Sequence, residues 1–449
     1  MNKSIGIVGG GISGLTTAFL LKSKGFSVTL FDKNASVGGN MRSRRMDGFL
    51  IEQGPNSLLK SPRLVDLIKA LQLETEILPS NPAAKKRYIL QNGKLCALPT
   101  RIVSIVSNKI FSAKAKFRLL KEPFTGSKSP ENETVAEFFE RRFGREIVEK
   151  AVDPFVSGIF AGNPLKLSIK SAFPHLYELE KDFGSLLLGM LRSKTEKTDK
   201  NFPRSFTFKD GVQTLPDKIA ENLGESVRVE TEAARIEKTA EGKFQMETGS
   251  GVEIFDALVI ATPAAAAAGL IESFDSDLSA KLKEIYYPPV VMVFFGIEKD
   301  KINADLEGFG FLIPGAEKRK ILGTLWNSSV FSGRAPENFH LLTNFVGGSR
   351  NAELFEKTDE ELIGIVYQEL QGIVGLKEKP AFMHVKRWSR AIPQYNVGHE
   401  KVEKGIEDFS AKMRGIFFCS NFYKGISVGD CVKNAYRTAD EIEEFLKEN

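Results

Sequence analysis

A glycine-rich turn close to the start of the chain constrains its fold more than any other feature of the sequence. Residues 4–8 (SIGIV) form a short apolar run that predicts a buried parallel strand, and residues 15–24 have the pattern of a helix. The turn between them has the spacing GxGxxG, and a second predicted strand at 27–31 ends at an acid. This order of strand, turn, helix, strand and acid is typical of a βαβ unit that binds a dinucleotide.

Each glycine of this turn has its own physical task in such a unit. Gly9 permits the tight turn, Gly11 has no side chain to hold the backbone away from a pyrophosphate, and Gly14 lets helix and strand pack closely. The helix N-terminus offers free N–H groups to phosphates, and Asp32 can accept hydrogen bonds from ribose hydroxyls. A purely structural turn is the alternative. The predicted nucleotide contacts are Gly9, Gly11, Ile12, Ser13, Gly14, Asp32 and Lys33.

A second pair of glycines follows the acid and narrows the choice of ligand. Gly38 and Gly39 lie in the segment VGGNMRS, with Arg42 just behind them. Domains that bind only NAD do not need this loop, whereas FAD enzymes of the amine-oxidase type use it to hold their longer cofactor. On this pattern the sequence resembles that superfamily, which implies FAD. It departs from the pattern at Ser36 and Asn40, where many members carry arginine.

Length and composition describe an ordinary globular protein with more than one core. The chain has 449 residues, so two or three domains are expected. The net charge of +5 comes without a dense tract of Lys and Arg, which argues against nucleic acid as a partner. Three cysteines without metal or redox spacing fit free thiols in a reducing compartment. The four histidines form no metal signature, so no metal site is expected.

The sequence predicts contact with a membrane surface but no span across it. The strand predicted at 4–8 leaves no room for a targeting segment in front of it. No run of eighteen apolar residues exists, so no transmembrane helix is expected. Between 101 and 121, apolar residues alternate with Lys and Arg and no acid occurs, as in helices that lie on membranes. The alternative is a core-facing helix with a solvated basic face.

The rest of the chain predicts a second sheet and a return to the nucleotide unit. A hairpin is expected around Asn92-Gly93, and a helix at 134–143 begins with the capping pattern TVAE. A strand at 415–419, a glycine-rich loop and a helix to 446 are expected to rejoin the first sheet. Four runs are expected to form one antiparallel sheet: 290–297, 309–313, 321–326 and 340–346.

Short segments along nearly the full length carry a closer resemblance. Their order and spacing are similar to those of the oxygen-dependent, FAD-containing protoporphyrinogen oxidases. The segments are GPNS (54–57), KRY (86–88), NG (92–93), DPFVSG (153–158), AG (161–162), EGFG (307–310), LGTL (322–325), FVGGSR (345–350) and GISVG (425–429).

This resemblance implies an α/β protein of three parts. An FAD-binding, Rossmann-like domain would be built from the discontinuous segments 1–80, 215–270 and 405–449. An α+β substrate-binding domain would comprise 81–95, 205–214 and 271–404. A helical membrane-binding domain would cover 96–204, which contains the basic apolar stretch.

The resemblance also assigns roles to individual positions. Arg87 would pair with a substrate propionate, Leu312 and Leu325 would enclose one pyrrole ring, and Phe345 would stack on a neighbouring ring. Without the resemblance, these three apolar residues are ordinary core residues of strands and Arg87 is a solvated charge. Asn56 would lie near flavin and pocket, and the carbonyl of Gly158 would face the pyrrole nitrogens. Further cofactor contacts would be Gly38, Gly39, Arg42, Val229, Thr262, Trp388, Asn421 and Val428.

The implied reaction explains why the sequence shows no obvious acid–base pair. Aromatising a porphyrinogen removes six electrons, and a flavin accepts them in pairs while O₂ becomes H₂O₂ over three cycles. The protein then has chiefly to hold a large apolar disc against the cofactor. A bidentate arginine suits a carboxylate better than a lysine does.

Several alternatives remain open at this stage. Coproporphyrinogen III, with four propionates instead of two, is the nearest alternative to protoporphyrinogen IX. An amine oxidase, a carotenoid desaturase and a non-catalytic flavin- or tetrapyrrole-binding protein are others. The resemblance further implies a homodimer, docking with a ferrochelatase, and a place at the cytoplasmic side of the cell membrane or in the cytoplasm.

Overall fold

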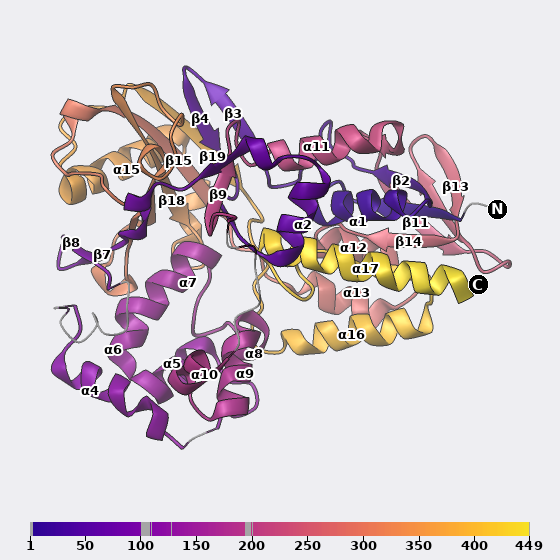
Figure 1. Ribbon diagram of the computed structural model, residues 1–449, viewed down its shortest axis with the longest axis horizontal. Helices are drawn as coiled ribbons and strands as arrows, with labels where there is room; N and C mark the ends of the chain where they lie inside the picture. Colours follow the sequence, from indigo (N-terminus) through magenta and orange to yellow (C-terminus); the bar gives the residue numbers. More distant parts are fainter. Residues whose placement is uncertain are drawn as a thin grey trace.

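Three regions make up the fold, and the two ends of the chain lie in the same one. The computed structural model describes residues 3–99, 108, 110–126, 128–193, 199 and 201–448. Figure 1 shows an α/β region on the right that holds both termini, a region of long strands at the upper left, and a group of helices below it.

The α/β region is built on a five-stranded sheet of order β10-β2-β1-β14-β20, in which every pairing is parallel. The two strands on either side of the glycine-rich turn and its helix pair with each other, as predicted. A strand from near the other end of the sequence joins the same sheet, which was also predicted. The strands are β1 (Ser4–Val8), β2 (Ser27–Phe31), β10 (Val227–Arg228), β14 (Ala257–Ile260) and β20 (Ile416–Phe418).

Alternating side chains of these strands supply two separate cores. Ile5 and Ile7 point into a core with one set of helices, whereas Val8 points into the core on the other face. The first set is α1 (Ile12–Ser23), α2 (Pro62–Ala70), α11 (Thr214–Leu223) and α17 (Val428–Glu448). The second face is covered by α12 (Ala264–Ile271), α13 (Ser276–Lys283) and α16 (His399–Lys412), with the hairpin strands β11 (Ala233–Lys238), β12 (Phe244–Thr248) and β13 (Gly251–Phe255).

The region of long strands contains a seven-stranded sheet of order β19-β15-β18-β17-β16-β7-β8. The four predicted runs are neighbours in it and pair antiparallel, which confirms that prediction. The expected hairpin also forms, with Asn92 and Gly93 at positive φ (51° and 72°), as its tight turn requires. The strands are β7 (Tyr88–Gln91), β8 (Lys94–Ala97), β15 (Val290–Glu298), β16 (Gly310–Leu312), β17 (Ile321–Trp326), β18 (Phe339–Gly347) and β19 (Phe382–Trp388).

The two faces of this sheet have different environments. One face packs against α15 (Asp359–Val374) in a closed apolar core. Beside the other face lies the hairpin β3 (Ser43–Met46) and β4 (Phe49–Glu52), whose Phe49 stacks on Phe382 with ring centroids 4.7 Å apart. A small antiparallel sheet of β5 (Leu58–Leu59), β6 (Ile77–Pro79) and β9 (Ser205–Phe208) packs with the first core of the α/β region, through Leu58, Phe206 and Phe208.

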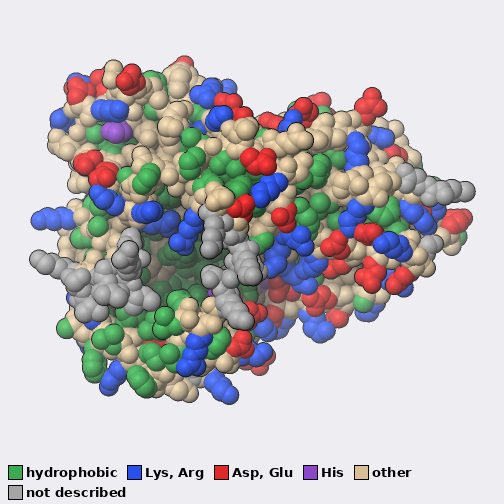
Figure 2. Space-filling model, viewed as in Figure 1, with side chains coloured by type: hydrophobic (Ala, Val, Ile, Leu, Met, Phe, Trp, Pro, Cys, Tyr) green, Lys and Arg blue, Asp and Glu red, His purple; other side chains and the backbone are tan. Residues whose placement is uncertain are grey.

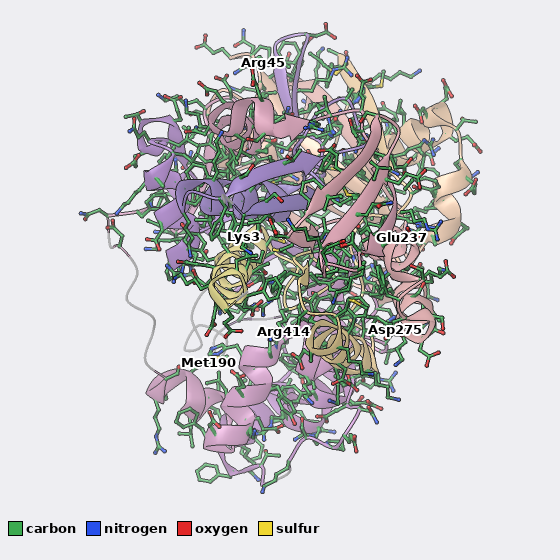
Figure 3. The ribbon with its side chains drawn as sticks, turned by 90° about the vertical axis from the view of Figure 1, so that its right-hand side faces the viewer. Lys3, Arg45, Met190, Glu237, Asp275 and Arg414 are labelled. Carbon is green, nitrogen blue, oxygen red and sulfur yellow. The ribbon has the colours of Figure 1, made fainter. Side chains whose placement is uncertain are left out.

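The helical region packs short helices around its own core and is set apart from the α/β region in a second view (Figure 3). The predicted capping box forms at α5, where Thr134 and Glu137 bond reciprocally. Residues 101–107 and 109 of the predicted membrane stretch lie outside the described residues. The helices are α4 (Ala113–Lys121), α5 (Val135–Phe143), α6 (Arg145–Ile147), α7 (Asp153–Phe160), α8 (Ile169–Ala172), α9 (Pro174–Phe183) and α10 (Leu186–Arg192).

A buried charge network holds this region together. Glu122 is fully buried, pairs with Arg142 at 2.6 Å and accepts a hydrogen bond from the backbone N–H of Leu186, at the start of α10. Arg142 also pairs with Glu180 of α9. Because a buried charge without a partner is very costly, these contacts fix how α5, α9 and α10 meet.

The apolar run from Phe183 to Leu191 predicts one helix, but in the structure α9 ends at Phe183 and α10 begins at Leu186. Gly184 between them adopts a left-handed conformation (φ 69°) that favours glycine. Among the described residues, no helix combines the length and the apolar character needed to cross a membrane.

Candidate active site

One large cavity runs from the α/β region to the long-stranded sheet and the helical region. Its volume is about 2940 Å³, and it is bounded by the glycine-rich turn at one end and by the open face of the seven-stranded sheet at the other. Figure 2 shows a hollow between the upper and lower parts, with hydrophobic side chains inside it and Lys and Arg side chains around it.

The glycine-rich turn has the geometry that a pyrophosphate needs. Gly9 has a positive φ of 112°, and a Cβ on Gly14 would lie 2.0 Å from the Gly9 carbonyl oxygen. A side chain at position 9 would strain the backbone, and one at position 14 would clash with it, whether or not a ligand is bound. A Cβ on Gly11 would meet no atom within 4 Å, so its missing side chain leaves open space in front of the helix N-terminus. Ile12 and Ser13 line the cavity beside it.

Asp32 is placed to serve both the turn and a ligand. Its carboxylate accepts hydrogen bonds from the backbone N–H of Gly10 at 2.7 Å and of Asn34 at 2.8 Å. The side chain is only 7% exposed and lines the cavity, where its remaining lone pairs can accept bonds from hydroxyl groups. Lys33 also lines the cavity, and its ammonium lies 3.9 Å from Glu232.

The second glycine pair forms the opposite lip of the cofactor end. Gly38 and Gly39 adopt positive φ (104° and 57°), and both line the cavity. Arg42 donates hydrogen bonds to the Gly39 carbonyl at 3.0 Å and to the Ser36 hydroxyl at 2.7 Å. The serine that departs from the superfamily pattern is thus a hydrogen-bond partner of Arg42, which holds the loop in place.

Most of the remaining predicted cofactor contacts also reach the cavity. Thr262, Trp388, Asn421 and Val428 line it. The hydroxyl of Thr262 is buried and has no hydrogen-bond partner among the described residues, which leaves it available to a ligand. Val229 follows β10 but is not among the cavity-lining residues, and the wall beside it is made by residues 231–234.

These residues fit FAD. An open space before a helix N-terminus, a buried acid for hydroxyl groups and an unpartnered buried threonine hydroxyl match a pyrophosphate, a ribose and a polar cofactor edge. The second glycine loop extends the site along the cavity toward the seven-stranded sheet. The geometry accommodates a dinucleotide at one end and leaves the apolar end open for a substrate.

A single row of side chains across the seven-stranded sheet forms the wall of that apolar end. Strand register aligns one residue from each of six neighbouring strands, and every one of them lines the cavity. In order across the sheet, the row consists of Lys386, Met292, Phe345, Gly323, Leu312 and Ile89.

The glycine of this row makes a depression between two predicted site residues. Gly323 pairs with Leu312 on one side and with Phe345 on the other. A Cβ on it would lie 2.5 Å from the Phe311 carbonyl oxygen and 3.1 Å from Leu312 Cδ2. Leu325, two residues further along the same strand, also lines the cavity. The wall therefore offers a shallow apolar surface suited to a flat ring system.

The helical region closes the opposite side of this pocket through α7. Gly158 approaches Leu312 so closely that a Cβ would lie 2.3 Å from the leucine Cδ2. Arg350 ties α7 to the sheet, since it donates hydrogen bonds to Asp153 at 3.0 Å and to Ser157 at 2.8 Å. The segment FVGGSR thus carries a wall residue, Phe345, and the arginine that holds the facing helix.

Arg87 provides the cation at the entrance of the pocket. It lines the cavity immediately before β7, with its guanidinium 4.7 Å from the centre of the Phe309 ring. Burial of the group, and then the nearby cation Arg204, lower the pKa of Arg87. No ion pair to Arg87 forms within the described part of the chain. A guanidinium in this setting is suited to an incoming carboxylate.

Asn56 is held rigidly on the cavity wall rather than free to act on a ligand by itself. Its side-chain oxygen accepts a hydrogen bond from Asn327 at 2.8 Å, and its amide donates to the Gly54 carbonyl at 3.2 Å. Asn327 in turn accepts a bond from the Thr343 hydroxyl at 2.7 Å. This chain of buried hydrogen bonds orients the amide of Asn56 in the cavity.

Sequence reasoning missed four members of the wall: Met292, Gly323, Ile89 and Lys386. Alternation along each strand marks which residues share a face, but the register that aligns six strands is not visible in any one of them. Lys386 lies with its ammonium 4.3 Å from the centre of the Trp388 ring. Burial, and then Arg42, lower the pKa of Lys386. Within the described residues, no group of His, Cys, Asp and Glu could hold a metal ion.

Comparison with known proteins agrees with this geometry. Residues 12–443 match the family described as flavin containing amine oxidoreductase. Protoporphyrinogen oxidase 2 (chloroplastic/mitochondrial) of Arabidopsis thaliana is 32% identical and aligns over 99% of this chain and 94% of its own. Coproporphyrinogen III oxidase of Bacillus subtilis (strain 168) is 30% identical over 96% of both chains.

Solved structures show the same fold. A candidate protoporphyrinogen oxidase from Exiguobacterium sp. 255-15 matches with a TM-score of 0.83 and 26% identity, over 99% of both chains. Cyclohexylamine oxidase from Brevibacterium oxydans matches with a TM-score of 0.73, but at 17% identity this likeness concerns the fold alone.

Proposed function

The chain belongs to the family of flavin-containing amine oxidoreductases, and we propose that it oxidises protoporphyrinogen IX to protoporphyrin IX, with FAD as cofactor and O₂ as electron acceptor. The observation that carries the proposal is the row from Met292 to Ile89. It places a flat apolar wall in the same cavity as a dinucleotide site, with Arg87 at the entrance. An amphiphilic disc with apolar rings and carboxylates on one edge fits these surfaces.

The protein's own residues position the substrate and exclude water. The bound flavin supplies two-electron oxidation, and O₂ regenerates it with release of H₂O₂. Phe345, Leu312 and Leu325 pack against the pyrrole rings, and the depression at Gly323 lets the macrocycle lie close to the sheet. Arg87 fixes the rotation of the disc by pairing with a propionate.

The facing helix α7 contributes backbone rather than side chains at its closest point. Gly158 lines the cavity opposite Leu312, and its carbonyl group is the candidate acceptor for pyrrole N–H groups. The row itself carries no acid or histidine that could act as a general base. Proton loss from the pyrroles would then depend on tautomerisation and solvent rather than on a dedicated side chain.

Coproporphyrinogen III is the competing substrate. A relative named coproporphyrinogen III oxidase is nearly as similar to this chain as the plant protoporphyrinogen oxidases are. The competing substrate has four propionates in place of two. The row is apolar from Met292 to Ile89, with Lys386 as its one cation at the far end, and a carboxylate buried against the apolar members without a partner is costly. This difference favours the substrate with vinyl groups on the edge that lies against the wall.

Anaerobic titration of the yellow holoenzyme tests the proposal. Protoporphyrinogen IX is expected to bleach the flavin absorbance, and air is expected to restore it together with porphyrin fluorescence and peroxide. Bleaching by coproporphyrinogen III alone would keep the reaction and change the substrate. Bleaching by an amine, and by neither porphyrinogen, would contradict the proposal.

We further propose that the helical region binds the cytoplasmic face of a membrane. Phe124 is 86% exposed and Leu191 is 82% exposed. Their segments are joined, because Glu122 accepts a hydrogen bond from the backbone N–H of Leu186 at the start of α10. Figure 2 shows hydrophobic side chains on the surface of this lower part. Large exposed apolar groups beside Lys121 and Arg118 suit an interface of anionic lipid.

Flotation with anionic vesicles tests the membrane proposal. The variants Phe124→Ser and Leu191→Ser are expected to lose binding, whereas Leu59→Ser, which removes an exposed leucine far from these helices in the sequence, is expected to retain it. Binding should survive moderate salt, because apolar insertion accompanies the charge; release by salt alone would contradict this. The homodimer and the docking of a ferrochelatase stay predictions.

A further inference from the structure

A chain of three polar side chains connects the interior of strand β18 to the cavity wall. The Thr343 hydroxyl donates to Asn327 Oδ1 at 2.7 Å, and Asn327 Nδ2 donates to Asn56 Oδ1 at 2.8 Å. Asn56 Nδ2 then donates to the Gly54 carbonyl at 3.2 Å. Thr343 is fully buried and Asn327 is 4% exposed, whereas Asn56 is half-buried and lines the cavity. The chain of bonds therefore begins inside the sheet and ends at the site.

The last member of this chain sets the direction of every bond in it. The Gly54 carbonyl can only accept, so the Nδ2 side of the Asn56 amide has to face it. The Asn56 oxygen then faces Asn327, whose own amide is thereby turned with its oxygen toward Thr343. A flip of either amide would break the bonds on both sides of it and leave buried polar atoms without partners, which is costly.

These bonds leave Asn56 with one free donor. An asparagine amide carries two N–H donors, and the Gly54 carbonyl uses one of them. The other has no partner within the part of the chain that the structure describes. Because Asn56 lines the cavity, its amide offers an N–H group to a ligand there. The chain behind it prevents the amide from presenting its oxygen instead.

The backbone beside Asn56 lies where the two ends of the cavity meet. The Gln53 N–H donates to the Arg42 carbonyl at 2.8 Å, and the Trp388 indole donates to the Gln53 carbonyl at 2.6 Å. Arg42 belongs to the second glycine loop of the cofactor end, and Trp388 ends strand β19 of the substrate wall. The flavin ring of FAD has to reach that wall from the glycine-rich turn, so it passes this junction.

A fixed N–H donor at this junction favours the reduced flavin over the oxidised one. When the ring takes a hydride, the C–H bond of the substrate breaks and the ring becomes an anion, so a hydrogen bond to it becomes charge-assisted and stronger. Because the donor is oriented in advance, no reorganisation is needed when the charge appears. The reduction potential of the cofactor rises accordingly, as it does at other redox centres with hydrogen-bond donors.

We propose that Thr343 and Asn327 are positioning residues: they hold the Asn56 amide as a hydrogen-bond donor to the flavin ring and thereby raise the reduction potential of bound FAD. Neither of the two lines the cavity, so their effect on the cofactor passes through Asn56. The inference requires the cofactor but no particular substrate, and it therefore goes beyond the proposed function.

The reduction potential of the FAD-loaded protein tests this inference without any substrate. It is measured by slow enzymatic reduction beside a reference dye, with the absorbance of flavin and dye followed together. Thr343→Val removes the hydroxyl and keeps the shape, whereas Thr343→Ser keeps the hydroxyl. Asn327→Leu keeps the branched shape without hydrogen bonds, and Asn56→Leu removes the donor itself. Should Asn327→Leu not fold, the two Thr343 variants and Asn56→Leu suffice.

Asn344→Leu is the matched control for Asn327→Leu. Asn344 is also buried, accepts a hydrogen bond from the Thr324 hydroxyl at 2.8 Å and donates to the Val293 carbonyl at 3.0 Å. It thus forms the same kinds of bond on the same sheet, but none of them leads to Asn56. Its loss should cost stability and leave the potential of the flavin unchanged.

Thr343→Val and Asn327→Leu are each expected to shift the two-electron equilibrium about tenfold toward oxidised FAD, which is about 30 mV. Asn56→Leu should give at least the same shift. Thr343→Ser and Asn344→Leu should stay within about twofold of wild type. In protein that already carries Asn56→Leu, adding Thr343→Val should change nothing further, since both act through one amide.

Three results would overturn the inference. An unchanged potential in Asn56→Leu would show that the amide does not reach the ring. A shift in Asn344→Leu as large as that in Asn327→Leu would indicate a general effect of a lost buried hydrogen bond. A further shift by Thr343→Val on top of Asn56→Leu would mean that its effect does not pass through the amide.

The outcome is independent of the test of the proposed function. If the potentials follow the expected pattern but no porphyrinogen bleaches the flavin, the proposed function fails while this inference stands. If porphyrinogen bleaches the flavin and the potentials do not change among the variants, only this inference fails.

Discussion

The two ends of the cavity are specified in different ways. The cofactor end is built by a contiguous stretch, in which Gly9, Gly11 and Gly14 lie within six residues and Asp32 follows one helix and one strand later. The substrate end is built by one residue from each of six strands, spread from Ile89 to Lys386. A local motif keeps its geometry when residues elsewhere in the chain are substituted. The row keeps its geometry only if each pair of neighbouring strands keeps its register.

The difference predicts separable failures at the two ends. A substitution in the turn should remove the cofactor without disturbing the substrate wall. A substitution in the row should do the reverse. The variants below probe this separation, and they run from the largest expected effect to the smallest.

Gly11→Val should abolish bound FAD while the protein still folds. Its Cβ would meet no protein atom within 4 Å, so only the approach of the pyrophosphate is blocked. We expect an affinity loss of about a hundredfold or more, measured as flavin absorbance after gel filtration. Thermal unfolding of the apoprotein should match that of wild-type apoprotein; a much lower midpoint would show that the turn is not locally independent.

Gly323→Ala should damage the substrate end alone. The added methyl group would fill the depression between Leu312 and Phe345 and press on the Phe311 carbonyl. We expect kcat/KM for the porphyrinogen to fall by about a hundredfold, with FAD content unchanged. Gly364→Ala is the control, because a Cβ there meets nothing within 4 Å. Loss of flavin from Gly323→Ala would contradict the separation of the two ends.

Arg87→Ala should raise KM about tenfold and change kcat by less than about twofold. A propionate contact at the entrance is present in ground state and transition state alike, so its loss weakens binding more than it slows the reaction. Steady-state kinetics with protoporphyrinogen IX measures both constants. An unchanged KM would remove Arg87 from the substrate site.

Glu52→Gln should produce the smallest effect, and one that depends on pH. Glu52 lies on β4 between the two ends and bonds to Ser43 at 2.5 Å and to the backbone N–H of Val212 at 3.1 Å. Burial raises the pKa of Glu52 from 4.5 to about 7, against the opposing effects of Ser43 and Arg334. The folded protein therefore keeps a proton that the unfolded chain has lost.

The sign of this effect follows from proton binding. Below pH 4.5 the group is neutral in both states; between pH 4.5 and about 7 only the unfolded chain is ionised, so stability falls as pH rises. Urea unfolding at pH 5 and pH 7.5 should show this decline in wild type and reduce it in Glu52→Gln, by on the order of 1 kcal/mol. Parallel profiles would show that Glu52 is ionised in the fold. FAD content should not change.

The same contrast explains what could be predicted from the sequence. Features that depend on neighbouring residues in the chain were predicted. They are the turn, the acid, the hairpin at Asn92, and the strand and helix near residue 446 that return to the first sheet. The four runs of the antiparallel sheet were also visible. Met292 and Gly323 were not, since their importance depends on facing Phe345 across strands. The break at Gly184 was missed because Phe183 was grouped with the apolar run that follows from Leu186.

The cations of the cavity were predicted only in part for a related reason. Arg87 belongs to a recognisable segment, whereas Lys386 joins the wall only through the register of β19 with β15. The exposure of Phe124 and Leu191 likewise follows from how the helical region packs, not from its composition.

The last strand and the last helix have a consequence for the order in which the protein can be made. The fingerprint turn is synthesised long before β20 and α17, yet its sheet is completed by β20, and α1 packs against α17. Lys24, just after α1, pairs with Asp440 at 2.6 Å. A ribosome must therefore synthesise β20 and α17 before the cofactor site can close. Synthesis of these two elements and capture of the flavin become consecutive events in the life of the protein.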